Sequence, residues 1–180
     1  LYKKGTEDLT SAQHNKYDRI IEQMDGAPGR VLEVGCGWGG FAERAADTSD
    51  IDLKGITISD EQYDYAKSRV DGKANIVLED YRNQEGKFDN IVSIEMFEAV
   101  GEAFWSTYFE KMKSLLSEKG KAVIQTITIR DEDFDRYRKG SDFIRSYIVP
   151  GGMLPSVSRF EEEANKAGLQ VADKFAFGKD

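Results

Sequence analysis

The 180-residue chain has very few of the residues that build covalent or metal-held scaffolds. It contains one cysteine, Cys36, and one histidine, His14. A lone cysteine excludes an intramolecular disulfide, and one cysteine with one histidine makes no zinc cluster. No run of about 18 apolar residues is present to span a bilayer, and the first residues resemble neither a signal peptide nor a transit peptide. We therefore expect a cytoplasmic protein with no metal site and no transmembrane segment.

Positive charge is also in deficit. The chain has 25 Lys and Arg residues against 33 Asp and Glu residues, a net charge of −8. This balance disfavours non-specific binding to nucleic acid. Arg136, Arg138 and Lys139 form only a short cationic stretch, too small for electrostatic docking on anionic lipid. With no repeats and no low-complexity linker, residues 1–180 are expected to form one domain.

The most informative segment is residues 31–40, with the sequence VLEVGCGWGG. A short apolar run predicts a strand buried on both faces. Gly35, Gly37 and Gly39 then allow a ligand to approach bare main chain. A helix that begins near Gly39 or Gly40 directs its free N–H groups at the same place. The segment predicts a binding corner for a small molecule that carries a carboxylate or a phosphate.

The identity of that small molecule depends on the residues around the glycines. Gly35, Gly37 and Gly40 also fit the Gly-x-Gly-x-x-Gly pattern of dinucleotide sites. However, Glu33 would repel a pyrophosphate and suits an ammonium group, and the next strand runs into a helix-capping box at 59–62. These features favour S-adenosylmethionine over a nicotinamide dinucleotide. The alternative is that Glu33 is a solvated acid and that 59–62 only starts a helix.

Alternating strand and helix patterns predict the fold class, α/β, with a doubly wound, mostly parallel sheet and helices on both faces. We expect helices at 11–24, 40–47, 60–71, 103–117 and 157–167, and strands at 30–34, 52–58, 75–79, 89–95, 121–129 and 169–176.

Four sequence blocks together resemble one enzyme family. They are the glycine loop, GITISDEQ at 55–62, SIEMFEAVG at 93–101 and YIVPGGMLPS at 147–156. In this order they resemble the cyclopropane-fatty-acyl-phospholipid synthase family, whose members use S-adenosylmethionine to modify double bonds of lipid acyl chains. The resemblance implies a Rossmann-like class I methyltransferase fold. Since the chain stops shortly after the sixth predicted strand, we expect a trimmed core without the usual seventh strand.

The resemblance also implies a set of cofactor-binding residues. The amino-acid part of the cofactor would lie against the glycines, Thr57 and Gln62 would approach the ribose, and Tyr81 would lie near adenine. The full expected set is Glu33, Gly35, Gly37, Gly39, Thr57, Ser59, Gln62, Asp80, Tyr81 and Ile94.

For the reaction itself the resemblance implies Glu98 and Gln125 as catalytic residues. In the family a bound bicarbonate serves as base, held partly by a glutamate that Glu98 matches. Its partner is commonly histidine, and Gln125 stands there instead, able to donate a hydrogen bond but not to carry charge. Ala99 also stands where histidine is frequent. The structural alternatives are an exposed carboxylate for Glu98 and a backbone-satisfied amide for Gln125.

The stretch 143–155 is the expected contact with the acyl chain, because it is apolar, contains an adaptable methionine and is too short to cross a membrane. Ordinary core packing is the alternative. The expected partners are unsaturated phospholipid acyl chains met at a membrane surface, and exposure of this stretch would favour a homodimer. Three functions remain open: a lipid methyltransferase that forms a cyclopropane or methyl branch, a small-molecule N-methyltransferase, and a non-catalytic cofactor-binding core.

Overall fold

The computed structural model describes residues 2, 5, 8–24, 29–140 and 151–177. Within them, five parallel strands form one sheet in the order β3-β2-β1-β4-β5. The strands are β1 Arg30–Val34, β2 Asp52–Thr57, β3 Asn75–Leu78, β4 Phe88–Ile94 and β5 Leu116–Gln125. The chain builds outward from β1 to β3 and then returns to β4 on the other side of β1. The doubly wound parallel sheet predicted from the sequence is confirmed.

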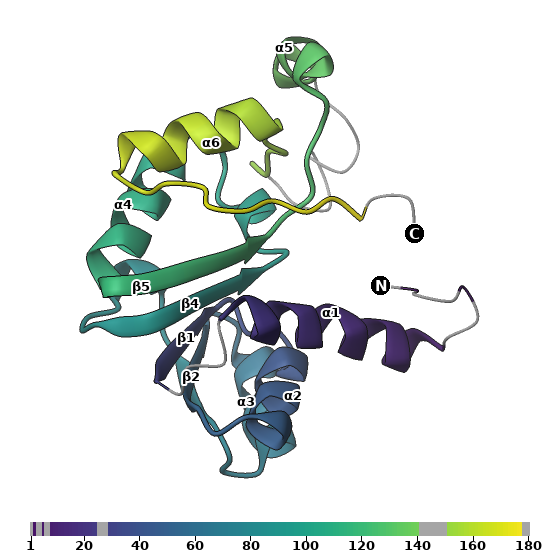
Figure 1. Ribbon diagram of the computed structural model, residues 1–180, viewed down its shortest axis with the longest axis vertical. Helices are drawn as coiled ribbons and strands as arrows, with labels where there is room; N and C mark the ends of the chain where they lie inside the picture. The colour runs from purple at the N-terminus through teal and green to yellow at the C-terminus, as the bar shows by residue number, and fades with distance from the viewer. Residues whose placement is uncertain (1, 3–4, 6–7, 25–28, 141–150, 178–180) are drawn as a thin grey trace.

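Helices cover both faces of the sheet (Figure 1). One face carries α1 Leu9–Gln23, α2 Gly40–Thr48 and α3 Asp60–Val70; the other carries α4 Trp105–Leu115 and α6 Val157–Lys166, while α5 Asp131–Lys139 stands away from the sheet. Three short 3-10 turns, η1 Tyr81–Asn83, η2 Phe97–Ala99 and η3 Glu102–Phe104, follow β3 and β4. No helix among the described residues is long and apolar enough to cross a bilayer.

The alternation of side chains along β1 divides the core into two clusters. Leu32 and Val34 pack in the cluster beneath α4 and α6, whereas Val31 packs in the cluster beneath α1, α2 and α3. All three side chains are buried, as expected for a central parallel strand. Because successive residues face opposite sides of a strand, Glu33 lies on the same face as Val31, toward α1.

Local signals in the sequence explain where two of the helices begin. Gly39 precedes α2 with φ +77°, a left-handed conformation that glycine adopts without strain. Ser59 caps α3, where its Oγ accepts a hydrogen bond from the backbone N–H of Gln62 at 3.2 Å. Ser59 therefore starts this helix as predicted, but the reciprocal half of the capping box is replaced: both the Ser59 N–H and the Gln62 side chain bond to the Thr57 hydroxyl.

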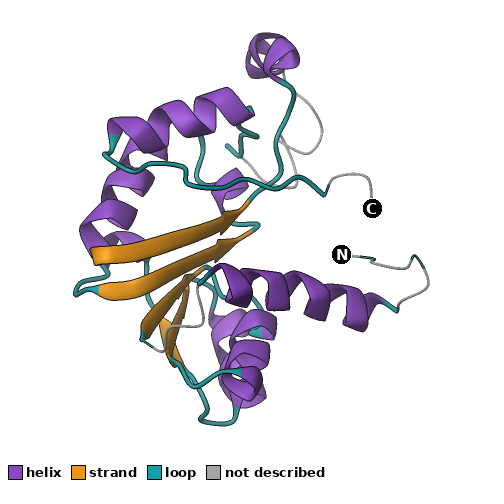
Figure 2. Cartoon of the chain, viewed as in Figure 1, coloured by secondary structure: helices purple, strands orange, loops and turns teal. Residues whose placement is uncertain are grey.

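The predicted strand at 169–176 is wrong. Residues 169–177 make no strand pairing and are drawn as loop in Figure 2. Most of this segment is exposed, and Lys174 and Phe175 make side-chain contacts instead of a hydrogen-bonded ladder: Lys174 pairs with Glu161, and the Phe175 ring lies 3.6 Å from the guanidinium carbon of Arg19. A segment with strand-like composition becomes a strand only when it pairs with another, and none of the described strands pairs with it.

Two boundaries and one helix also differ from the prediction. The helix predicted to reach residue 117 ends at Leu115, because Leu116 already pairs with Phe88 as the first residue of β5. The strand predicted over 121–129 therefore begins earlier, and it ends at Gln125. The sequence reading missed α5 altogether. Its first turn is acidic and its last turn is basic, an arrangement that favours a helix.

Candidate cofactor and catalytic site

The predicted site residues lie at the carboxyl ends of the parallel strands, which meet at one edge of the sheet. Backbone hydrogen bonds join neighbouring strand ends: Gly35 N–H donates to the carbonyl of Ile56 at 3.0 Å, and Glu95 N–H donates to the carbonyl of Gln125 at 2.9 Å. The order in which strands are added to the sheet reverses between β1 and β4: β2 and β3 lie on one side of β1, and β4 and β5 on the other. In open α/β sheets ligands bind in the crevice at such a switch point. The glycine loop follows β1 directly.

The glycine loop, called here the glycine cradle, has a backbone that side chains would strain. Gly35, Gly37 and Gly39 all have positive φ, at +77°, +52° and +77°. A Cβ at Gly35 would lie 2.8 Å from Cγ of Met96, and one at Gly39 would lie 3.0 Å from Cβ of Ala66. Both the backbone angles and the close approaches therefore require glycine, and the loop presents bare main chain to a ligand.

Glu33 is a buried carboxyl at the end of β1. Its side chain is 2% exposed, and its Oε2 has no hydrogen-bond partner among the described residues. Burial raises the pKa of Glu33 well above its usual range. The alternative that Glu33 is a solvated acid is therefore wrong. An unpartnered buried acid beside a glycine cradle fits a ligand with an ammonium group, which would supply the missing donor.

The residues expected near the ribose form one connected group after β2. Thr57 is buried, and its Oγ1 donates to Oε1 of Gln62 at 2.7 Å. The backbone N–H of Ser59 donates to the Thr57 hydroxyl at 3.3 Å. The arrangement holds the Gln62 amide at the start of α3.

On the far side of β2, Asp80 and Tyr81 follow β3. Asp80 accepts hydrogen bonds from the backbone and guanidinium of Arg82, which lower the pKa of Asp80. Tyr81 is half-buried, with its ring edge-to-face against Tyr108 at 5.7 Å. Packing fixes the Tyr81 ring, whereas Asp80 is already engaged by its own neighbour.

Glu98 and Gln125 lie together on the other side of the switch point. Oε1 of Glu98 accepts from the backbone N–H of Ile127 at 2.6 Å, and the Glu98 carbonyl accepts from Met153 N–H at 2.9 Å. The remaining oxygen of Glu98 and the amide oxygen of Gln125 are buried without a partner in the described part of the chain. Ile94 pairs in register with Gln125 at the ends of β4 and β5. This corner therefore contains two unsatisfied polar groups.

The predicted acyl-contact stretch is described only in part. Residues 143–150 lie outside the described residues. In the remainder, Met153 is 3% exposed and packs in the core cluster beneath α4 and α6. Gly101 approaches Gly151 so closely that a Cβ on Gly101 would lie 2.8 Å from the Gly151 carbonyl oxygen. These contacts bring the 151–153 segment against the turn that carries Glu98.

One charged residue near the site was missed in the sequence. Lys16 of α1 is buried, and its Nζ donates to Oε1 of Glu95 at 3.0 Å, directly after β4. The available signal was its position: Ala12, Lys16 and Ile20 recur every four residues and form the buried stripe of the helix. A lysine inside an apolar stripe is unusual enough to indicate a role.

Comparison with known proteins gives consistent matches. A family profile described as mycolic acid cyclopropane synthetase matches residues 1–180. The chain is 38% identical to the cyclopropane-fatty-acyl-phospholipid synthase of Escherichia coli K12, over 99% of this chain and 46% of that protein. It is 35% identical to the tuberculostearic acid methyltransferase UfaA1 of Mycobacterium tuberculosis, over 92% of this chain and 40% of that protein.

The fold matches a solved structure of similar description. The crystal structure of mycolic acid cyclopropane synthase CmaA1, complexed with SAH and CTAB, superimposes with a TM-score of 0.85 at 28% identity, covering 96% of this chain and 66% of that one. The chain spans less than half the length of the curated relatives named above. With a family profile that covers all 180 residues, the chain belongs to the mycolic acid cyclopropane synthetase family.

Proposed function

We propose that this chain binds S-adenosylmethionine at the carboxyl edge of its sheet and provides residues for methyl transfer to the double bond of an unsaturated phospholipid acyl chain. The observation that carries the proposal is the meeting of two half-sites at one switch point. One half is the glycine cradle with the unpartnered Glu33; the other is the unsatisfied pair Glu98 and Gln125. The names of the relatives, which are cyclopropane synthases and fatty acid methyltransferases, support the same reaction class.

The cofactor half provides binding and orientation. The cradle of Gly35, Gly37 and Gly39 would hold the amino-acid part, Thr57 and Gln62 would approach the ribose, and Tyr81 would lie near adenine. Ser59, Asp80 and Ile94 complete the proposed set of cofactor-binding residues. Bound S-adenosylmethionine supplies a methyl group on a sulfonium, which an alkene attacks with its π electrons while the carbon–sulfur bond breaks. An alkene is a weak nucleophile, so alignment in a site that excludes water is the main contribution the protein can make.

The second half would complete the reaction. Methyl transfer leaves a carbocation on the acyl chain, and a base must then take a proton from the new methyl group so that the C–H electrons close the ring. We propose that Glu98 and Gln125 hold a bicarbonate ion for this step. The O–H of bicarbonate would donate to the unpartnered oxygen of Glu98, the amide N–H of Gln125 can donate one hydrogen bond to the ion, and the backbone N–H of Ile127 keeps the Glu98 carboxylate fixed.

The neutral amide at position 125 bears on the product. Because Gln125 cannot carry charge, the base is held less strongly than beside an imidazole, and the carbocation has more time to react otherwise. Methyl-branched acyl chains are therefore proposed alongside cyclopropane chains. The lipid would be reached by peripheral contact with a membrane surface, and a homodimer and a cytoplasmic location stay predictions.

The test uses the natural protein that contains these 180 residues. It is incubated with methyl-labelled S-adenosylmethionine and vesicles of unsaturated phosphatidylethanolamine, and lipids are analysed by mass spectrometry. We expect label in the acyl chains. Glu98→Gln should leave the affinity for S-adenosylhomocysteine unchanged and lower turnover about a hundredfold, the scale of losing a positioned acid–base group. Label that appears only in a small amine, or unchanged turnover in the variant, would contradict the proposal.

A further inference from the structure

Helix α1 brings a buried positive charge to the switch point of the sheet. Lys16 is 8% exposed, and it sits in the helix stripe that otherwise consists of apolar side chains. Its ammonium is paired with Glu95, whose side chain is 54% exposed. Glu95 is therefore in contact with solvent, whereas the Lys16 side chain is buried.

The neighbour of Lys16 shows how close this charge lies to the glycine loop. The Tyr17 hydroxyl is 2.8 Å from the position that a Cβ on Gly40 would take, so α1 packs directly on the start of α2. Burial raises the pKa of Tyr17, and the charges of Glu33 and Glu95 raise it further. Lys16 Nζ lies 5.3 Å from the Tyr17 ring centre. Tyr17, the residue next to Lys16 on α1, therefore lies beside the glycine loop and within electrostatic reach of Glu33.

Stability alone does not explain this arrangement. A buried lysine loses hydration that one half-exposed carboxylate only partly replaces, and an apolar side chain of similar length would pack at least as well. Glu95 also adopts φ +52°, a left-handed conformation that costs a non-glycine residue. Strained backbone and buried charges of this kind collect at binding sites, where a ligand compensates their cost.

We propose that Lys16 binds the carboxylate of the cofactor's amino-acid part while Glu33 binds its ammonium group. The inference rests on the proposed function, because it assumes that the glycine cradle holds an α-amino acid. A zwitterion needs one buried acid and one buried cation on the same face of the sheet. Glu33 shares with Val31 the face of β1 that α1 covers, and Lys16 of α1 reaches Glu95 directly after β4. In the free protein Glu95 forms the ion pair with the Lys16 ammonium, and the ligand carboxylate would take the place of Glu95.

Calorimetry with two ligands tests the proposal. The ligands are S-adenosylhomocysteine and its decarboxylated analogue, which keeps the ammonium. The unmodified chain should bind the analogue roughly 10- to 100-fold more weakly, the scale of one hydrogen bond between charged groups. Lys16→Met, which keeps length and burial, should lose the same factor for S-adenosylhomocysteine and none for the analogue. Glu95→Gln is the matched control, because it breaks the ion pair and keeps the lysine, and it should retain the preference for the carboxylate.

The outcomes separate the two proposals. A Lys16→Met chain that weakens both ligands equally would show that the lysine only positions α1, and equal affinity of the unmodified chain for both ligands would also overturn the inference. In both cases S-adenosylhomocysteine still binds the unmodified chain and the proposed function stands. If the unmodified chain binds neither ligand, the proposed cofactor site itself is wrong. Circular dichroism melting of each variant shows that it is folded before binding is compared.

Discussion

Replacing Glu33 by glutamine keeps the shape of the side chain and removes a buried acid, so it isolates the free-energy cost of that acid. Among the described residues Glu33 is 2% exposed, and its Oε2 has no partner. Burial raises the pKa of Glu33. The folded protein therefore holds this proton more tightly than the unfolded chain does.

The sign of the pH dependence follows from this difference. An unfolded glutamate has a pKa of about 4.3. The stabilising contribution of the protonated Glu33 is fully present below that pH and is lost as pH rises toward the folded-state pKa. The loss is at most about 1.4 kcal/mol per pH unit. Glu33→Gln removes this titration, so the stability of the variant relative to the unmodified chain should increase as pH rises above the unfolded-state pKa.

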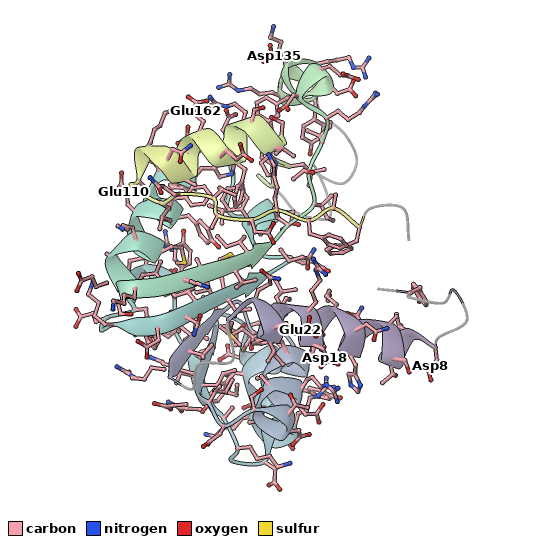
Figure 3. The ribbon with its side chains drawn as sticks, viewed as in Figure 1. Asp8, Asp18, Glu22, Glu110, Asp135 and Glu162 are labelled. Atoms are coloured by element: carbon pink, nitrogen blue, oxygen red, sulfur yellow. The ribbon has the colours of Figure 1, made fainter. Side chains whose placement is uncertain are left out.

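Urea unfolding without cofactor measures this gain, followed by the fluorescence of Trp38 and Trp105. Glu110→Gln serves as the control, because Glu110 is exposed on α4 (Figure 3). Its effect should stay within about 0.5 kcal/mol, as for most surface substitutions. If the stability difference between Glu33→Gln and the unmodified chain does not change with pH, the reasoning is refuted. Glu33 would then be ionised in the folded protein and compensated by a group near it.

Three further substitutions test other parts of the structure. Gly35→Ala places a Cβ 2.8 Å from Met96 at φ +77°, and should cost about 1–3 kcal/mol in urea unfolding and abolish S-adenosylhomocysteine binding; normal binding would contradict the cradle. Asp71→Gly should stabilise the chain by about 0.5–1 kcal/mol, because Asp71 ends α3 at φ +46° and is exposed; no gain in urea unfolding would mean that the aspartate side chain compensates. Gln125→His should raise the ratio of cyclopropane to methyl-branched chains in mass spectra of the natural protein's products, since an imidazole can carry charge; an unchanged ratio would place residue 125 away from the base.

The parts of the fold that the sequence predicted well are those with local causes. The apolar run of β1 and the left-handed Gly39 lie within one decapeptide, and Ser59 with its hydrogen bond to Gln62 starts α3 within four residues. Each signal acts over a few residues and does not depend on distant packing. The order of the predicted site residues along the carboxyl edge then followed from the parallel sheet alone.

The parts that were missed depend on partners distant in sequence. Leu116 continues the apolar pattern of α4, and only its pairing with Phe88 makes it a strand residue. The segment at 169–177 has a strand-like pattern but no neighbouring described strand. Lys16 was not singled out in the sequence, because its partner Glu95 lies 79 positions away. Contacts of this range are tertiary, and no periodicity in the sequence encodes them.

The distribution of unsatisfied groups in the sheet indicates where a ligand contributes to stability. At the amino end, Asp89 accepts from the backbone N–H of Arg30 at 3.0 Å and so completes a local hydrogen bond. At the carboxyl end, Glu33 and Gln125 each bury an oxygen without a partner in the described chain, and Glu95 holds a strained φ. Selection for stability alone would remove these groups, because a single substitution at each position would eliminate most of its free-energy cost. The unpartnered oxygens of Glu33 and Gln125 and the strained Glu95 therefore argue that the free protein is destabilised at the carboxyl edge and that bound ligands restore the missing interactions.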